Sequence, residues 1–112
     1  MNSTSIKLDE IFKGENDLVA AVLQDQITNQ VLMLAWMNRE ALELTLKTGR
    51  ATFWSRSRKQ IWVKGETSGN YQEVISLTLD CDQDSLLIKV KSQGPACHTG
   101  EVSCFNKNLS EI

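Results

Sequence analysis

Two stretches in the second half of the chain constrain the fold most, because in both of them apolar and polar residues alternate. They are residues 73–80 (EVISLTLD) and 86–91 (LLIKVK). Their apolar positions are Ile75, Leu77 and Leu79 in the first, and Leu86, Ile88 and Val90 in the second. Strict alternation places one set of side chains on each face of a strand. The stretches are therefore predicted to be half-buried strands, joined into a hairpin by Asp80–Ser85 (DCDQDS).

Four more segments are predicted to be strands. They are residues 18–23 (LVAAVL), 31–36 (VLMLAW), 51–56 (ATFWSR) and 61–63 (IWV). The first two are apolar runs separated by the polar residues 24–30, which is typical of a hairpin with a longer loop.

One segment has the pattern of a helix, at residues 39–47 (REALELTLK). Asn38 suits the N-cap and Gly49 the C-terminal stop, with Glu40 in the first turn and Lys47 in the last. The expected buried stripe consists of Ala41, Leu42, Thr45 and Leu46. With a second, short helix near Leu8–Lys13, the sequence predicts a mainly β fold with one main helix.

Length and charge narrow the class of protein. A chain of 112 residues is expected to be a single domain, residues 1–112. The net charge of −2, from 12 basic and 14 acidic residues, argues against binding nucleic acid. No apolar run is long enough for a membrane span, and the polar start of the chain lacks a signal-peptide core. We therefore expect a cytoplasmic protein whose cysteines are reduced.

Three cysteines, Cys81, Cys97 and Cys104, cannot all pair within one chain. Their spacing does not match the paired cysteines of structural zinc fingers. Three thiolates with no fourth ligand suit a catalytic zinc site, which keeps one position open for water; inert buried thiols are the alternative. The only histidine, His98, adjoins Cys97, so it is better placed to move protons beside the metal than to bind it. The alternative is an ordinary structural histidine.

The predicted hairpin tip carries Asp80, Asp82 and Asp84 at every second position. A turn would let these carboxylates converge on a hard cation such as Mg²⁺ or Ca²⁺. An EF-hand starting at Asp80 would need Gly at Ser85 and Glu at Lys91, so that motif is excluded. The alternative is an acidic turn that only faces solvent.

Residues 52–70 combine basic and aromatic side chains in a way that suits a phosphorylated heterocycle. The residues are Trp54, Arg56, Arg58, Lys59, Trp62 and Lys64, followed by the small polar loop 65–70 (GETSGN). The standard nucleotide-binding loops are absent, and an exposed basic strand with its tryptophans in the core is the alternative. Together with the zinc and acidic sites, the segment favours a metal-assisted hydrolase acting on a nucleotide-like substrate.

Several motifs in the same order resemble the phosphoribosyl-AMP cyclohydrolase family. They are VLMLAWMNREAL, TFWSRSR, KGETSGN, DCDQD and GPACHTGEVSCF, which together cover roughly residues 15–106. The resemblance implies hydrolysis of the N1–C6 bond of the adenine ring in 1-(5-phosphoribosyl)-AMP, the third step of histidine biosynthesis. It also implies a homodimer. The expected fold is α+β and mainly β, a compact β-sandwich or pseudo-barrel.

The resemblance implies site residues as well. Zinc would be held by Cys81, Cys97 and Cys104, drawn from both subunits, and magnesium by Asp80, Asp82 and Asp84. From residue type we expect His98 to act as the base, Arg56, Arg58 and Lys64 to neutralise the phosphates, and Trp54 or Trp62 to stack on the base. The chain ends at Ile112, which suggests the stand-alone form of the enzyme rather than a fusion. The alternatives are a nucleobase deaminase, whose H-x-E and C-x-x-C patterns are missing, and a zinc-stapled dimeric nucleotide-binding module without catalysis.

Overall fold

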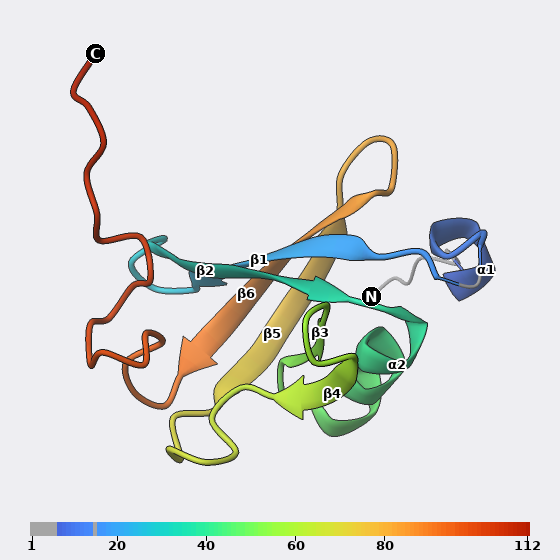
Figure 1. Ribbon diagram of the computed structural model, residues 1–112, viewed down its shortest axis with the longest axis horizontal. Coiled ribbons are helices and arrows are strands. Elements are labelled where there is room, and N and C mark those ends of the chain that lie inside the picture. Colours follow the sequence, from blue (N-terminus) through green and yellow to red (C-terminus); the bar gives the residue numbers. More distant parts are fainter. Residues whose placement is uncertain (1–6, 15) are drawn as a thin grey trace.

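The computed structural model describes residues 7–14 and 16–112 (Figure 1). Residues 1–6 and 15, which the single-domain prediction includes, lie outside the described residues. The elements are α1 (Leu8–Ile11), β1 (Val19–Asp25), β2 (Val31–Met37), α2 (Arg39–Thr48), β3 (Thr52–Ser55), β4 (Gln60–Val63), β5 (Gln72–Leu79) and β6 (Ser85–Ser92). In the part of the chain that is described, neither helix has the length and apolar character needed to cross a membrane.

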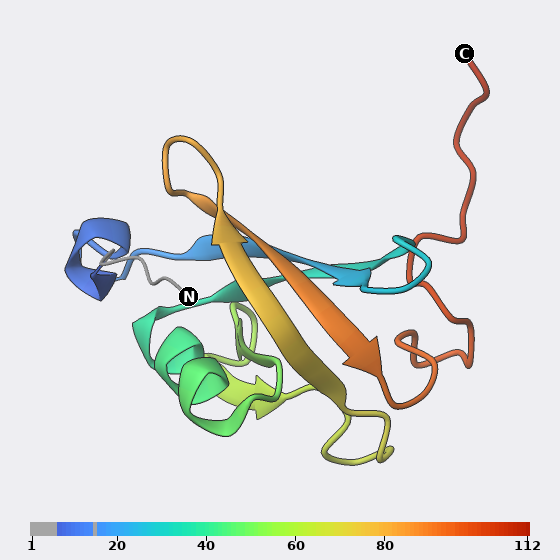
Figure 2. The ribbon, with the colours of Figure 1, turned by 180° about the vertical axis from the view of Figure 1, so that it is seen from behind.

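Four strands form the main sheet, in the order β2-β1-β6-β5. Both predicted hairpins are confirmed: β1 pairs antiparallel with β2, and β5 pairs antiparallel with β6. The two hairpins meet at the centre of the sheet, where β1 and β6 run parallel with Val22 opposite Leu87. As a result, the tip of the β5–β6 hairpin and the segment after β6 lie at opposite ends of the sheet (Figures 1 and 2).

The remaining strands, β3 and β4, form a separate antiparallel pair that packs with α2 over one face of the main sheet. The core between these layers includes Leu42 from α2, Phe53 from β3, and Leu23 and Ile88 from the main sheet, all buried. The mainly β, α+β class is thus confirmed. The predicted pseudo-barrel is wrong, because the two sheets do not close: the described strands β3 and β4 pair only with each other.

Helix α2 begins and ends where the sequence predicts. The Asn38 side chain accepts a hydrogen bond from the Ala41 N–H at 2.8 Å, and Gly49 adopts a left-handed conformation with φ of 75°. Ala41, Leu42 and Thr45 are buried as expected. Leu46 is not: it is 57% exposed. Successive residues of a helix point about 100° apart. Because Thr45 points into the core against β3, the next side chain, Leu46, points toward solvent.

Strand β5 departs from the predicted alternation at Ile75, which is 49% exposed although Leu77 and Leu79 pack against the core. The register with β6 shifts between Val74 and Ser76, so Ile75 is the extra residue of a bulge. A bulge reverses the inside–outside order of the residues before it. Val74 therefore faces the core in place of Ile75. The predicted inward positions of β6 are all buried.

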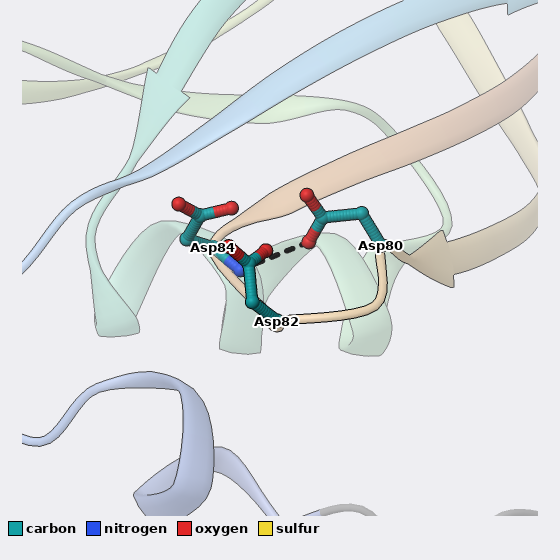
Figure 3. Close-up of side chains that lie close together, drawn as sticks. All are labelled: Asp80, Asp82 and Asp84. Carbon is teal, nitrogen blue, oxygen red and sulfur yellow. Dashed lines mark hydrogen bonds between the residues drawn. The ribbon is translucent and has the colours of Figure 1, made fainter.

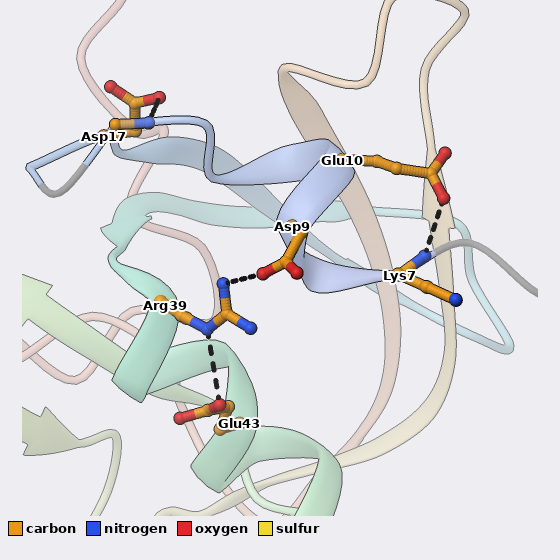
Figure 4. A network of polar contacts seen from close by, with 7 residues as sticks. Lys7, Asp9, Glu10, Asp17, Arg39 and Glu43 are labelled. Carbon is orange, nitrogen blue, oxygen red and sulfur yellow. Dashed lines mark hydrogen bonds and ion pairs between the residues drawn. The ribbon is translucent and has the colours of Figure 1, made fainter.

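Helix α1, at the predicted short helix, is attached to α2 by polar contacts on the surface (Figure 4). Arg39 lies 2.6 Å from Asp9 of α1 and 3.5 Å from Glu43 in the next turn of α2. Exposed ion pairs contribute little to stability. Their effect here is to orient α1 beside α2, where Leu8 and Ile11 pack against the edge of the core.

Candidate active site

Two loops far apart in sequence lie side by side at one end of the molecule (Figures 1 and 2). Between them is a pocket of about 780 Å³. One loop follows β4 and contributes residues 64–68 and 70; the other follows β6 and contributes residues 95–98 and 100. The β3–β4 hairpin completes the wall with Ser55, Arg58, Gln60, Ile61, Trp62 and Val63. A pocket of this size accommodates a small-molecule ligand.

One glycine allows a tight turn within the first loop, and another allows the two loops to approach closely. Gly65 has φ of 90°, and a Cβ there would overlap the backbone of Asn70. A Cβ at Gly94, in the other loop, would overlap the side-chain amide of Asn70. Buried Gln72 also bridges them: its side-chain N–H donates to the Asn70 carbonyl at 3.3 Å and to the Ser92 hydroxyl at 3.1 Å. The shape of the pocket therefore depends on small residues at these contacts.

The segment after β6 brings Cys97 and Cys104 to the same place. The Ala96 N–H donates to the Val102 carbonyl and the Cys97 N–H to the Glu101 carbonyl, each at 3.1 Å, which folds the segment into a tight reversal. The Cys104 N–H then donates to the Leu32 carbonyl at 2.7 Å, so β2 anchors this end. The chain thus presents two thiols together, beside the pocket.

The surroundings of the two sulfurs differ. The Thr99 hydroxyl lies 3.0 Å from the Cys97 sulfur, and this contact, with the Thr99 N–H, lowers the pKa of the Cys97 thiol. Desolvation raises the pKa of Cys104, and the neighbouring Cys97 thiolate raises it further, against the effect of Lys64. The Cys97 thiol therefore loses its proton more readily than the Cys104 thiol, and a bound cation would favour the thiolate form of both.

Cys81 lies at the other end of the sheet, in the tip of the β5–β6 hairpin, and is exposed. Strand β6 separates it from Cys97, and its 8 residues span about 26 Å at roughly 3.3 Å per residue. Two sulfurs bound to one zinc lie under about 4 Å apart. Within the described residues the three cysteines of a single chain are therefore not gathered around one point, unlike the three aspartates at the tip.

Asp80, Asp82 and Asp84 converge at the tip, as predicted, with one oxygen from each within 4.8 Å of the others (Figure 3). The turn is held by the Asp80 carboxylate, which accepts from the N–H groups of Asp84 at 3.0 Å and Ser85 at 3.2 Å. Desolvation opposes the charge of Asp80, but these N–H groups outweigh it and lower its pKa. Hydrogen bonding to Asp82 and Asp80 raises the pKa of Asp84. Three exposed carboxylates at this distance form a suitable site for a hard divalent cation.

The predicted substrate residues divide into two sets. Arg58, Trp62 and Lys64 line the pocket, and His98 lines it next to Cys97. Trp62 is held by Phe53, with ring centroids 5.0 Å apart. The other two, Trp54 and Arg56, are not in the pocket wall: Trp54 lies opposite Ile61 in the hairpin, and the Arg56 guanidinium lies 4.7 Å above the ring of Trp36.

Sequence reasoning missed residues that support the site. Thr99 contacts the Cys97 sulfur, and Asn106 approaches it at 3.9 Å. Ser103 is buried, and its hydroxyl donates to the Val31 carbonyl at 2.7 Å, which fixes the segment between the two cysteines. The nearness of Thr99 to Cys97 in the sequence was a usable signal. Ser103 had none, because its partner is distant in the chain.

Comparison with known proteins agrees with this geometry. The sequence model of the family described as phosphoribosyl-AMP cyclohydrolase matches residues 33–106, the part that holds the pocket, the cysteines and the acidic tip. The chain belongs to the phosphoribosyl-AMP cyclohydrolase family. It is thus an enzyme, a cyclohydrolase of histidine biosynthesis.

Individual relatives of this cyclohydrolase are closely similar. The phosphoribosyl-AMP cyclohydrolase of Hyphomonas neptunium is 62% identical over 95 residues, covering 85% of this chain and 72% of the relative. That of Methanosarcina acetivorans is 60% identical over 104 residues, covering 93% of this chain and 86% of the relative. The histidine biosynthesis bifunctional protein HisIE of Thermosynechococcus vestitus is 57% identical over 105 residues, which make up 93% of this chain and 49% of that longer protein.

Proposed function

We propose that this cyclohydrolase is a zinc- and magnesium-dependent homodimer that opens the adenine ring of 1-(5-phosphoribosyl)-AMP by hydrolysing the N1–C6 bond. Zinc is held by Cys97 and Cys104 of one copy with the partner's Cys81. The observation that carries the proposal is the pairing of Cys97 and Cys104 beside a pocket lined by His98 and basic side chains.

The donor atoms fit these metals. Two neighbouring thiols, one with a lowered pKa, suit a thiophilic cation such as zinc, and three convergent carboxylates suit magnesium. Bound zinc supplies Lewis acidity, which makes water a nucleophile near neutral pH. Three thiolates leave room for that water.

The separation of the cysteines supports the proposed dimer. Strand β6, whose 8 residues span about 26 Å, separates Cys81 from Cys97 of the same chain, so we assign the third thiolate to a second copy. Asp80, Asp82 and Asp84 share the hairpin tip with Cys81. The partner that supplies Cys81 therefore brings its acidic cluster to the same pocket. Magnesium there would orient ribose or phosphate oxygens of the substrate.

The pocket suits a nucleotide that carries two phosphates. Lys64 and Arg58 place positive charge on its wall, and Trp62 offers an aromatic face held rigid by Phe53. Arginine binds phosphate oxygens in a bidentate manner. The neighbouring loop residues 65–68 present a small polar surface to the same space.

His98 handles the protons. The ribosyl group on N1 makes the purine ring cationic and its C6 electrophilic. Water adds at C6 and loses one proton to His98. The N1–C6 bond then breaks as the C6 hydroxyl becomes the carboxamide carbonyl; the departing N1 takes the proton from His98, and the hydroxyl proton is released to solvent. His98 suits this exchange because it lies in the pocket next to Cys97 and because an imidazole nitrogen can accept a proton and return it.

A direct assay tests the proposal. Purified protein, supplied with Zn²⁺ and Mg²⁺, is given phosphoribosyl-AMP while the ultraviolet absorbance of the ring-opened product is followed. We expect turnover that is lost on zinc chelation and in Cys97→Ala. His98→Asn should keep its bound zinc but lose most of the rate. A folded, zinc-loaded dimer without turnover would contradict the proposed reaction and indicate a nucleotide-binding module instead.

A further inference from the structure

A second hollow lies away from the pocket, beside the acidic hairpin tip. It is an apolar groove of about 500 Å³ between α1, α2 and β5. Leucine and isoleucine side chains from these three elements form its walls, and Asp80 and Gln83 of the tip form its rim. Leu46 on α2 is 57% exposed here, with only solvent to contact on one side. Apolar side chains left open in a groove are typical of an interaction surface.

The C-terminal segment, residues 105–112, also carries apolar side chains that are exposed, because the segment does not pack against the rest of the chain that the structure describes. It extends away from the rest of the chain (Figure 1). Phe105 is 64% exposed, Leu109 98% and Ile112 fully exposed. Among the described residues, the hydrogen bonding of 107–112 consists of one local contact, from the Ile112 N–H to the Ser110 hydroxyl.

In its own chain the segment cannot bring Leu109 to the groove, because Leu109 follows Cys104 by five residues, which span at most about 17 Å. The segment starts after Cys104, which β2 anchors near the far end of the sheet, while the groove lies at the tip of the β5–β6 hairpin. The 8 residues of β6 put about 26 Å between these ends. Figure 2 shows the two ends and the outward course of the segment.

The groove of a second copy is within reach. If Cys104 and the partner's Cys81 bind one zinc, the two residues are neighbours, and Asp80, the residue before Cys81, is on the rim of the groove. Leu109 follows Cys104 by five residues, which span up to about 17 Å of extended chain. A shared metal would thus place the start of the segment close to the groove of the other copy.

We propose that residues 105–112 of each copy pack into the groove of the other, with Leu109 and Ile112 as apolar anchors against Leu46 and β5. The inference rests on the proposed sharing of zinc between two copies. The exchange is symmetric, so a dimer contains two such contacts. Burial of two large aliphatic side chains per contact would tighten the dimer.

Photo-crosslinking tests the proposal. A photoreactive amino acid replaces Leu109, and this protein is mixed with ¹⁵N-labelled wild-type protein under conditions of subunit exchange, in the presence of zinc. We expect cross-links from residue 109 to peptides of α2 and β5 of the labelled copy. The reverse placement, at position 46, should capture residues 105–112 of the other copy. Cross-links to the same copy, to another surface or to no peptide would overturn the proposal.

Two substitutions provide an independent readout. Leu109→Asp should raise the dimer dissociation constant at least about tenfold, because it removes a buried leucine from the contact. Ile27→Asp is the matched control: Ile27 is 80% exposed in the β1–β2 turn and should leave the dimer unchanged. An equal effect of both, or of neither, would refute the docking. Zinc content and turnover of the wild-type protein separate the two claims, since a zinc-loaded, active dimer without these cross-links contradicts only the docking.

Discussion

The sharing of the zinc site between subunits can be tested by restoring activity from two inactive variants. Cys97→Ala removes one ligand of the site to which a copy contributes two thiolates. Cys81→Ala removes the ligand that the same copy lends to its partner. A dimer made of either variant alone lacks one zinc ligand in each of its two sites. Both variants should therefore be inactive.

A mixture of the two variants has a definite expected activity. In a hybrid dimer both substitutions fall in the same zinc site. The other site is intact: the Cys81→Ala copy supplies Cys97 and Cys104, and the Cys97→Ala copy supplies Cys81. Random exchange makes half of the dimers hybrid, each with one working site, so about one quarter of wild-type activity should return. The assay is turnover of phosphoribosyl-AMP before and after the variants are incubated together.

The result depends on the length of β6. Its 8 residues span about 26 Å between the tip that holds Cys81 and the segment that holds Cys97, whereas two sulfurs bound to one zinc lie under about 4 Å apart. If one chain gathered all three thiolates, no mixture would recover activity. A mixture that exchanges subunits, shown by mass spectrometry of labelled copies, and yet stays inactive would refute this reasoning. Cys97→Ala mixed with Cys104→Ala is the negative control, because those lesions fall in different sites of the hybrid and spoil both.

Two further predictions concern residues outside the metal sites. Arg58→Ala should raise KM about tenfold or more through loss of a charged hydrogen bond to phosphate, whereas Arg56→Ala should change it less, because Arg56 lies over Trp36 and outside the pocket wall; equal effects in steady-state kinetics would contradict the assignment. The second concerns pH. The hydrogen bond from the Thr28 N–H lowers the pKa of Asp25 in the folded protein. The charged Asp25 therefore stabilises the fold above the unfolded pKa of about 4, and this stabilisation is lost as the pH falls through the lower folded pKa. Acid unfolding followed by circular dichroism should therefore depend less steeply on pH in Asp25→Asn.

Local sequence patterns predicted the elements well, because the causes of those elements are local. Asn38 and Gly49 marked both ends of α2, and alternation located β6 and its buried face. Alternation failed at Ile75, because a bulge depends on the pairing partner and leaves no trace in the strand itself. The predicted burial of Leu46 on α2 was wrong, because packing against β3 determines which face of the helix is buried.

The residues of the candidate site could be named from the sequence, but their positions relative to one another could not be predicted. The cysteines, the aspartates and the pocket residues Arg58 and Lys64 were all named from residue type, spacing and family resemblance. Their distribution between the two ends of the sheet follows from the parallel pairing of β1 with β6, which no local pattern encodes. Asn70 was named only as the end of the polar loop 65–70, because its close approach to Gly94 depends on a distant loop.

That central pairing also affects how the chain folds. Val22 and Leu87 are neighbours in the sheet although most of the chain lies between them. Contacts of such long sequence separation are slow to form. During synthesis, the β1–β2 hairpin leaves the ribosome well before β6, and until then the inner edge of β1 has backbone groups without strand partners. Such an edge is open to pairing with other chains. A nascent or truncated chain that lacks β6 is therefore the form of this protein most prone to aggregate.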